Sequence, residues 1–257
     1  LMAVRIFRRL KQAVLGRNTR AFSTTKPVPR MFEMRKYSLK PDLAGKYWTE
    51  LNNAADVRRR LLPLLLFANP ETGGRLHVAT HLYGYQDHME RDRKRAAALQ
   101  DPDWQAFLSK TKQCINHMES SIYVEAKATL EACGLPGAAG FDGAAKAEKP
   151  GIYEFRRYEL ALGYTTVPRF LEYYGEGLPS KLDADPEAEL VTLLYSDVGM
   201  LNEVYEIWRH ADSNSMTRSR IAAREAKQWR LSIGKIAELA RSFNTTILKP
   251  VEASNWK

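Results

Sequence analysis

The 257-residue sequence contains few of the residues that usually mark metal or redox chemistry. It has only two cysteines, Cys114 and Cys133, and neither lies in a paired motif, so we expect reduced thiols and no disulfide framework. An HExxH motif and a glycine-rich phosphate loop are both missing. The longest apolar run, Leu61–Ala68, has eight residues and contains Pro63. Because a membrane helix needs about 20 apolar residues, we expect no transmembrane segment.

Acidic residues are absent from the first 30 positions, and this absence accounts for most of the net charge of +9. Eight basic residues lie there: Arg5, Arg8, Arg9, Lys11, Arg17, Arg20, Lys26 and Arg30. The other 227 residues therefore carry a net charge of only +1. A nearly neutral folded part does not favour nucleic-acid binding, so we expect no DNA partner.

Residues 1–25 have the composition of a mitochondrial presequence. Apolar residues recur at helical spacing over Ile6–Leu15, with arginines on the opposite side and hydroxyl residues following. An arginine-rich, acid-free amphipathic segment is typical of a transit peptide, and Arg20-Ala-Phe-Ser23 resembles a processing site cleaved after Phe22. We therefore expect a mitochondrial protein, in the matrix or on the matrix face of the inner membrane. The alternative is a basic helix lying on a membrane surface.

The sequence contains a long internal repeat. Met31–Tyr37 returns 121 residues later as Ile152–Tyr158, and further along the chain Trp104 returns 125 residues later as Trp229. A period near 120 is far longer than the roughly 20–50 residues of a solenoid unit. The pattern indicates duplication of a whole domain, with modules at 30–127 and 151–251.

Residues 128–150, rich in glycine, alanine and proline, are expected to form a flexible linker between the modules. Hydrophobic periodicity predicts the same order, β-α-β-β-α-β, in both modules. In the first module the expected strands are 31–38, 61–67, 75–85 and 114–126, with helices from Pro41 and over 88–112. In the second they are 152–160, 188–196, 201–210 and 243–250, with helices over 165–181 and 212–239.

This order gives an α+β fold in which each module is a four-stranded antiparallel sheet with helices on one face. The other sheet face must be covered. We expect the two modules to cover each other, as an intramolecular pseudo-dimer.

The repeated motifs resemble the NIPSNAP family over most of residues 31–250. They are Tyr153-Glu-Phe-Arg-Arg-Tyr158, Gly199-x-Leu201-Asn202 and Arg218-x-Arg220, with Gly74-Arg-Leu76-His77 and Asp101-Pro102-x-Trp104 in the first module. The resemblance implies two tandem ferredoxin-like modules that form a dimeric α/β-barrel, and a non-catalytic mitochondrial protein connected with matrix or inner-membrane complexes. It supplies no catalytic residues. The second module departs from the pattern at Lys227-Gln228-Trp229, and Arg91 aligns with Met216.

Polar residues on equivalent strands form the candidate site. Its members are Glu33, Arg35, Tyr37, His81, Glu154, Arg156, Tyr158 and Glu206. Polar and apolar residues alternate along these strands, so the polar groups lie on the face opposite the apolar one. We expect the polar groups to point into the space between the two sheets. They would either bind an anion and act as acid and base, or pair as ions and hold the modules in register. The second interpretation is favoured.

Metal and cofactor sites are not expected. His77 and His81 lie on a strand, roughly 13 Å apart, which is too far for a shared metal. The basic runs Arg58–Arg60 and Arg91–Arg95 have acidic neighbours, so a solvated face is favoured over RNA or lipid contact.

We therefore expect a non-catalytic interaction protein, an accessory subunit of a larger mitochondrial assembly such as a respiratory-chain complex. One alternative is a small-molecule or haem-binding monooxygenase-like enzyme, with an inter-sheet cavity above about 300 Å³. Another is a mitochondrial ribosome protein that contacts RNA.

Overall fold

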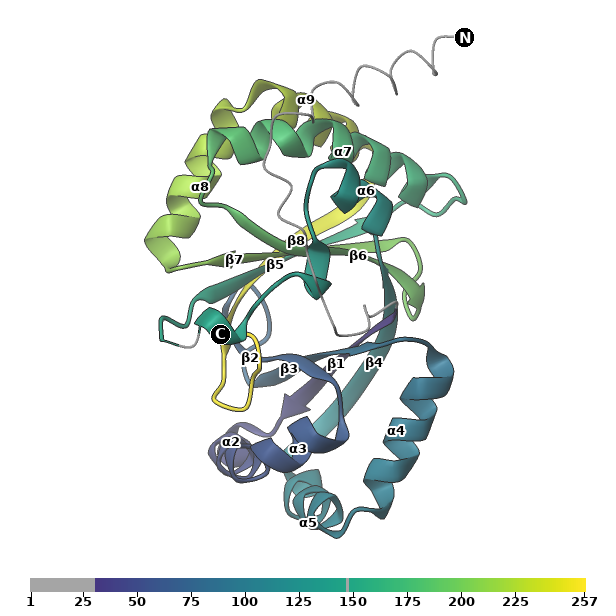
Figure 1. Cartoon of the computed structure of the whole chain (residues 1–257), viewed down its shortest axis with the longest axis vertical. Coiled ribbons are helices and arrows are strands. Elements are labelled where there is room, and N and C mark those ends of the chain that lie inside the picture. Colours follow the sequence, from purple (N-terminus) through teal and green to yellow (C-terminus); the bar gives the residue numbers. More distant parts are fainter. Residues whose placement is uncertain (1–30, 147) are drawn as a thin grey trace.

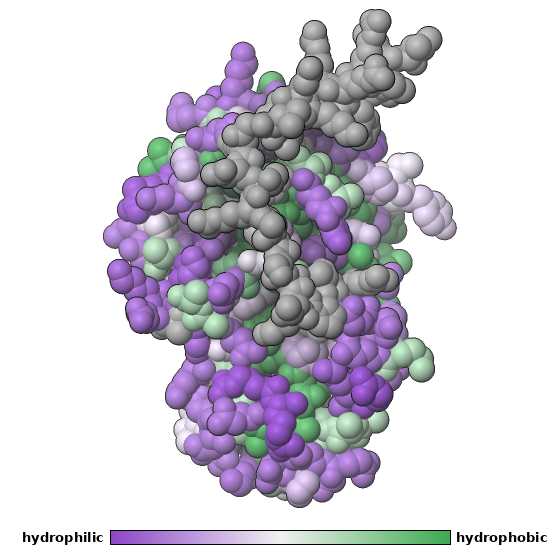
Figure 2. Space-filling model, in the orientation of Figure 1, coloured by the Kyte–Doolittle hydropathy of each residue, from purple (hydrophilic) through white to green (hydrophobic). Residues whose placement is uncertain are grey.

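The computed structural model describes residues 31–146 and 148–257. Eight strands form the centre of the molecule, and the helices of the two modules cover it at opposite ends (Figure 1). The face seen in Figure 2 is mainly hydrophilic over these helices, as expected when their apolar sides face the sheet. The predicted presequence at 1–25 lies outside the described residues.

The first module follows the predicted order. Its strands are β1 (Met31–Leu39), β2 (Leu64–Thr72), β3 (Val78–Tyr85) and β4 (Ile115–Glu125). Its helices are α2 (Ala44–Asn53), α3 (Ala55–Leu61), α4 (His88–Gln100) and α5 (Pro102–Thr111). Several boundaries differ: β2 covers 64–72 instead of 61–67, and β3 begins at Val78 instead of at residue 75. Leu61 ends a helix instead of beginning a strand. Pro63 disfavours helical backbone at Leu62, which is extended.

The second module repeats this arrangement. Its strands are β5 (Ile152–Leu160), β6 (Glu189–Val198), β7 (Glu203–His210) and β8 (Ala240–Pro250). Its helices are α7 (Thr166–Ala184), α8 (Ser213–Glu225) and α9 (Lys227–Leu239). Asp212 caps α8, because its carboxylate accepts the Ser215 backbone N–H at 2.7 Å. Helix α9 begins directly afterwards at Lys227.

The two sheets join edge to edge into one closed antiparallel barrel, in the order β1-β3-β2-β8-β5-β7-β6-β4. The seams are β2 against β8, where Ala68 pairs with Pro250, and β4 against β6, where Tyr123 pairs with Ser196. Closure leaves no free sheet edge. The predicted α+β fold of two modules in one dimeric α/β-barrel is confirmed.

Apolar side chains fill the middle of the barrel. Its buried members are Phe32, Met34, Leu66, Ala68, Leu82, Tyr123, Ala138, Tyr153, Phe155, Val191, Leu194, Tyr205, Ile207, Leu248 and Trp256. Two further apolar clusters lie between each sheet and its own helices. Strands β3 and β7 are buried along their whole length, whereas β4 and β8 have exposed residues in their first halves.

The segment between the modules is packed, although a flexible linker was expected. It contains helix α6 (Lys127–Ala132) and a short turn whose Ala138 N–H donates to Glu125 Oε1 at 2.8 Å. Gly137 has a φ of +66°, and a Cβ there would lie 2.5 Å from the same carboxylate oxygen, so only glycine fits. Phe141 packs edge-on against Trp256, with ring centroids 5.2 Å apart. The segment and the C-terminal tail together cover one end of the barrel.

A membrane-crossing helix was not expected. Within 31–146 and 148–257, none of the helices combines the length and the apolar character that a bilayer span requires.

Candidate functional site

The eight polar residues predicted from the sequence do not lie between the two sheets. Phe32 and Met34 occupy the barrel interior, so Glu33 and its alternating partners point to the helix side. The inter-sheet placement was wrong for a physical reason. A buried carboxylate needs a cation to neutralise it. Helix α4 supplies the arginines that pair with Glu33, so this side chain faces the helix and not the barrel interior.

Four of the eight residues form a cluster in the first module. Fully buried Glu33 accepts from Arg35 Nη1 at 2.9 Å, from Arg91 Nη2 at 2.8 Å and from Ser120 Oγ at 2.8 Å, and it also pairs with Arg95. Burial alone would raise the pKa of this carboxyl, but the Arg91 hydrogen bond and the arginine charges lower it to about 2. Glu33 therefore ties α4 to the sheet.

His81 lies deeper in the same cluster and is inaccessible to solvent. Its Nδ1 lies 2.8 Å from Tyr83 Oη, and its ring stacks on Phe67 with centroids 4.5 Å apart. Burial and the nearby Arg58 guanidinium hold the pKa of His81 well below its usual range. Arg58 donates to Tyr83 Oη at 2.5 Å and lies over the Trp104 ring at 4.7 Å, so this space is filled.

The other four residues form a second, separate cluster under the helices of the second module. Glu154 pairs with Arg220 Nη2 at 2.7 Å and with His210 Nε2 at 3.1 Å. Burial opposes the ionised form, but the His210 hydrogen bond and the Arg156 and Arg220 charges lower the pKa of Glu154 to about 2. The eight residues were predicted as one cluster between the sheets, and they instead form two equivalent clusters, one in each module.

Glu206 lies at the centre of this second cluster and is fully buried. It accepts from Tyr158 Oη at 2.5 Å and from Trp208 Nε1 at 2.6 Å, and Arg156 Nη1 lies 3.5 Å away. Burial and the Glu206 charge hold the pKa of Tyr158 well above its usual range. These groups are paired with one another, as the structural interpretation of the cluster expected, but the pairs lie within one module and do not hold the two modules in register.

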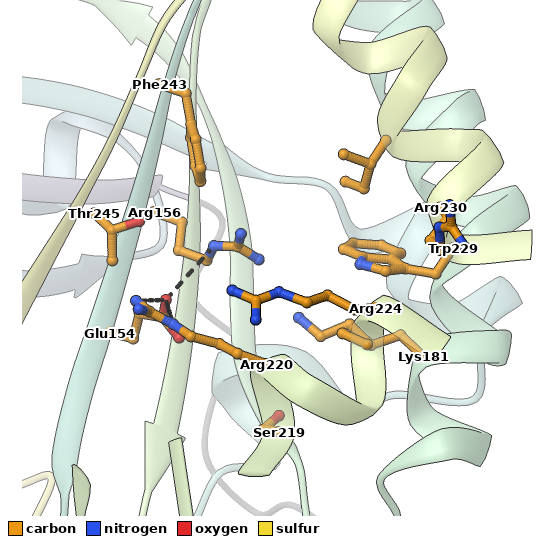
Figure 3. A pocket seen from close by; sticks show the side chains of 12 residues that line it. Glu154, Arg156, Lys181, Ser219, Arg220, Arg224, Trp229, Arg230, Phe243 and Thr245 are labelled. Carbon is orange, nitrogen blue, oxygen red and sulfur yellow. Dashed lines mark hydrogen bonds and ion pairs between the residues drawn. The ribbon is translucent and has the colours of Figure 1, made fainter. Parts of the chain in front are cut away.

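A cavity of about 510 Å³ opens directly beside the second cluster (Figure 3). It lies between helices α8 and α9 and strands β5 and β8. Its lining residues are Glu154, Arg156, Lys181, Ser219, Arg220, Ala223, Arg224, Trp229, Arg230, Ile233, Phe243 and Thr245. We call this space the module-2 cleft. Five of its side chains are basic and one is acidic, so its electrostatic character is cationic.

The basic groups converge on the middle of the cleft. In Figure 3 the Arg224 guanidinium points toward Arg156, and the Lys181 amine points the same way. Lys181 is buried, with its Nζ 3.4 Å from the Trp208 ring centroid and 4.8 Å from that of Trp229. Burial and the Arg156 charge lower the pKa of Lys181 to about 7.

The first module has different residues at the positions that correspond to the basic residues of the module-2 cleft. Arg58 occupies the position over Trp104 that Lys181 occupies over Trp229. At the 125-residue offset, Leu99 corresponds to Arg224 and Gln105 to Arg230.

Sequence reasoning missed Lys181, Arg224 and Arg230. The offset was a usable signal for the two arginines, because it puts a cation where the first module has a neutral residue. Lys181 gave no such signal. The offset between the modules changes from 121 residues at the first strand to 125 at the hairpin, and residue 181 lies between these two segments.

A second cavity, of about 500 Å³, lies at one end of the barrel beside Met200 in the β6–β7 turn. Its charged groups are already paired. Tyr123 Oη donates to Glu203 at 2.5 Å, Arg157 also pairs with Glu203, and Lys36 Nζ donates to Tyr205 Oη at 2.7 Å. It is therefore the weaker candidate for a ligand site.

Metal-binding geometry is not found. Within the part of the chain that the structure describes, no three His, Cys, Asp or Glu side chains are grouped so as to hold an ion. His77 was expected on the same strand as His81, but it lies in the β2–β3 turn with a φ of 56°, and only buried His81 lies on β3.

The closed barrel and its helix-side clusters define the chain as a dimeric α/β-barrel protein whose two halves are joined covalently. The NIPSNAP family model matches residues 32–129 and 153–255, once per module. The chain belongs to the NIPSNAP family.

Relatives of known name match along most of the chain. Protein NipSnap homolog 3A from Homo sapiens is 24% identical over 231 residues, covering 88% of this chain and 85% of that protein. Protein NipSnap homolog 3B from Mus musculus is 23% identical over 232 residues, with the same two coverages. The human and mouse proteins thus share both modules with this chain.

Solved structures of the same fold come from bacteria. A candidate monooxygenase from Fusobacterium nucleatum aligns with a TM-score of 0.58 at 10% identity, covering 88% of this chain and 94% of that one. A second, from Lactobacillus acidophilus, aligns with a TM-score of 0.56 at 10% identity, covering 86% and 94%. At this identity the likeness shows the fold alone.

Proposed function

We propose that the protein is a binding protein for a small organic anion, which it holds in the module-2 cleft. The observation that carries this proposal is the convergence of Arg156, Arg224 and Lys181 on one open cavity. Within the described residues, Arg224 and Arg230 have no carboxylate partner within ion-pair distance, so their guanidinium groups are available to a ligand.

The lining also indicates what kind of anion fits. Arginine forks bind carboxylate or phosphate groups through paired hydrogen bonds. Trp229, Ile233 and Phe243 add apolar surface to the same walls. We infer a ligand with an anionic head and an apolar or aromatic body, of a size suited to about 510 Å³.

Binding without turnover is the version we favour. The two carboxylates nearest the cleft, Glu154 and Glu206, are held by Arg220, His210, Tyr158 and Trp208. A carboxylate whose pKa lies near 2, as that of Glu154 does, is a weak base at neutral pH. The monooxygenase-like alternative stays open on fold likeness, and it predicts consumption of an oxidisable ligand in the presence of oxygen.

A role as an accessory subunit in mitochondria is a further proposal. It is motivated by the composition of residues 1–25 and by apolar side chains on the hairpin turns, where Leu76, Met200 and Leu201 are exposed. Exposed apolar groups of this kind suit a protein partner. Ligand binding in the cleft and attachment to a partner are compatible, because the hairpin turns contribute no residue to the cleft.

The anion proposal can be tested with 8-anilino-1-naphthalenesulfonate, a fluorescent aromatic anion, titrated into the full chain. Replacing Arg224 by the residue of the first module, Arg224→Leu, should weaken binding about tenfold, since a hydrogen bond to a charged group contributes about 1.5 kcal/mol. Arg218→Leu on the same helix is the matched control, because Arg218 is exposed and does not line the cleft. Equal affinities for both variants and the wild type would refute an anion site there.

A further inference from the structure

Lys181 is placed unusually for a lysine. It is buried on α7, yet it lines the module-2 cleft. Its Nζ lies 3.4 Å from the Trp208 ring centroid. Figure 3 shows the amine pointing into the cleft, toward Arg156. Among residues 31–146 and 148–257 its amine has no hydrogen bond and no ion pair with a carboxylate. Apart from its contacts with the two indole rings, the amine is therefore free to meet a ligand in the cleft.

The first module shows what a purely structural cation looks like at this position. Arg58 also lies over an indole ring, but its guanidinium is bonded to Tyr83 and enclosed by Phe67, Trp104 and Phe107. Arginine stays charged at all relevant pH values and is a poor nucleophile. The second module has a lysine here and an open cavity above it.

We propose that the Lys181 amine forms a reversible imine with a carbonyl compound that also carries a carboxylate or phosphate group. This inference rests on the proposed anion site, and it assigns that site a covalent step. The arginines would hold the anionic group while the carbonyl carbon lies against Nζ. Lysines desolvated beside other cations are the ones that react in this way.

The step is balanced without any further reactant. The lone pair of Nζ adds to the carbonyl carbon, and the carbonyl oxygen takes a proton to give a carbinolamine. Loss of that oxygen as water leaves a carbon–nitrogen double bond, and addition of water reverses the step. No electron acceptor is needed. The neutral imine becomes positively charged when it takes up a proton from solvent, and a cation–π contact with the Trp208 face then stabilises that charge.

The charges around Lys181 favour a free amine near neutral pH. The charged groups that act on its pKa are Arg156, Glu206, Glu154 and Asp185, and Arg220, Arg224 and Arg230 line the same cleft. Burial and Arg156 outweigh the carboxylates, giving the pKa of about 7. Exposed Lys235 on α9 behaves in the opposite way, since a hydrogen bond to Glu176 raises its pKa. Lys235 is therefore a matched control within the same module.

The test uses pyridoxal 5′-phosphate as the probe, with borohydride to trap the imine and peptide mass spectrometry to locate it. At pH 7.5, Lys181 should be trapped at least about tenfold faster than Lys235, because its amine is largely unprotonated and that of an ordinary lysine is not. Pyridoxal, which lacks the phosphate, should lose most of this preference. Arg224→Leu should reduce trapping about tenfold.

Two outcomes separate this inference from the proposed function. If Lys181 is trapped no faster than Lys235 while Arg224→Leu still weakens the sulfonate probe, the imine is refuted and the anion site stands. If neither effect is found, both are refuted. An excess of the sulfonate probe should protect Lys181 of the wild type from trapping, because both ligands would occupy the module-2 cleft. Trapping of Lys181 that the sulfonate leaves unchanged would overturn the imine at this site, and this test needs no variant of Lys181.

Discussion

Replacing Glu33 by glutamine should destabilise the protein through the loss of one buried charge. Helix α4 has a single buried residue, Ala98, so apolar packing contributes little to its attachment. Arg91 and Arg95 of α4 instead bind Glu33, which is fully buried on β1. The Glu33→Gln variant would leave these arginines without their counter-charge.

The expected magnitude follows from the pKa of Glu33, which falls from 4.5 to about 2 on folding. A depressed carboxyl pKa stabilises the folded state above pH 4.5, and this contribution is lost as the pH falls toward 2. With this pKa shift, ionised Glu33 contributes about 3 kcal/mol to the free energy of unfolding at pH 7 and about 2 kcal/mol at pH 3.5. The free energy of unfolding of Glu33→Gln should be lower than that of the wild type by these amounts.

Urea unfolding followed by tryptophan fluorescence at the two pH values would measure both differences. Glu119→Gln on β4 is the control, because its side chain is 57% exposed, and we expect a change within about 0.5 kcal/mol. The reasoning fails if Glu33→Gln is as stable as the wild type at pH 7. It also fails if the deficit does not shrink as the pH is lowered.

Three other outcomes are expected. Trp256→Ala should lower the free energy of unfolding by about 3–5 kcal/mol, since this buried indole packs on Phe141 and covers the barrel end. A loss below about 1 kcal/mol, measured by urea unfolding, would contradict that role. Because the pKa of Lys181 is lowered on folding, the wild type should gain stability relative to Lys181→Met between pH 7 and pH 10. A constant difference across that range, measured by thermal unfolding, would argue against a buried free amine. Residues 1–30 fused to a fluorescent reporter should direct it to mitochondria, and a diffuse signal in cell imaging would remove the basis for that location.

Strands β1 and β5 were predictable because both of their faces are at least partly buried. In β1 and β5 the alternation of Phe32 with Glu33, and of Phe155 with Glu154, is regular, and the repeat confirms each assignment with the other. The alternation did not tell which face points inward. At this point of β1 and β5 the helices present arginines to Glu33 and Glu154, so the apolar residues between them face the barrel interior, although apolar clusters also lie between each sheet and its helices.

The module-2 cleft was less accessible to prediction than the fold. Its basic residues stand out only when the two modules are compared, since Lys181 corresponds to Arg58 and Arg224 to Leu99, and such differences between copies are not motifs. The packed linker was missed for a similar reason. Its glycines indicated flexibility, whereas Gly137 is required by a close approach to Glu125 that only the tertiary structure brings about.

The most direct test of the anion site uses the five tryptophans as reporters, since they are spread over both modules. The indole N–H signals of Trp48, Trp104, Trp208, Trp229 and Trp256 can be followed by NMR in the 15N-labelled full chain during titration with the sulfonate probe. Binding in the module-2 cleft predicts that the Trp229 signal shifts most, with Trp208 next, while its counterpart Trp104 and the barrel-end Trp256 stay in place. Equal shifts at Trp104 and Trp229, or a shift confined to Trp256, would contradict the account.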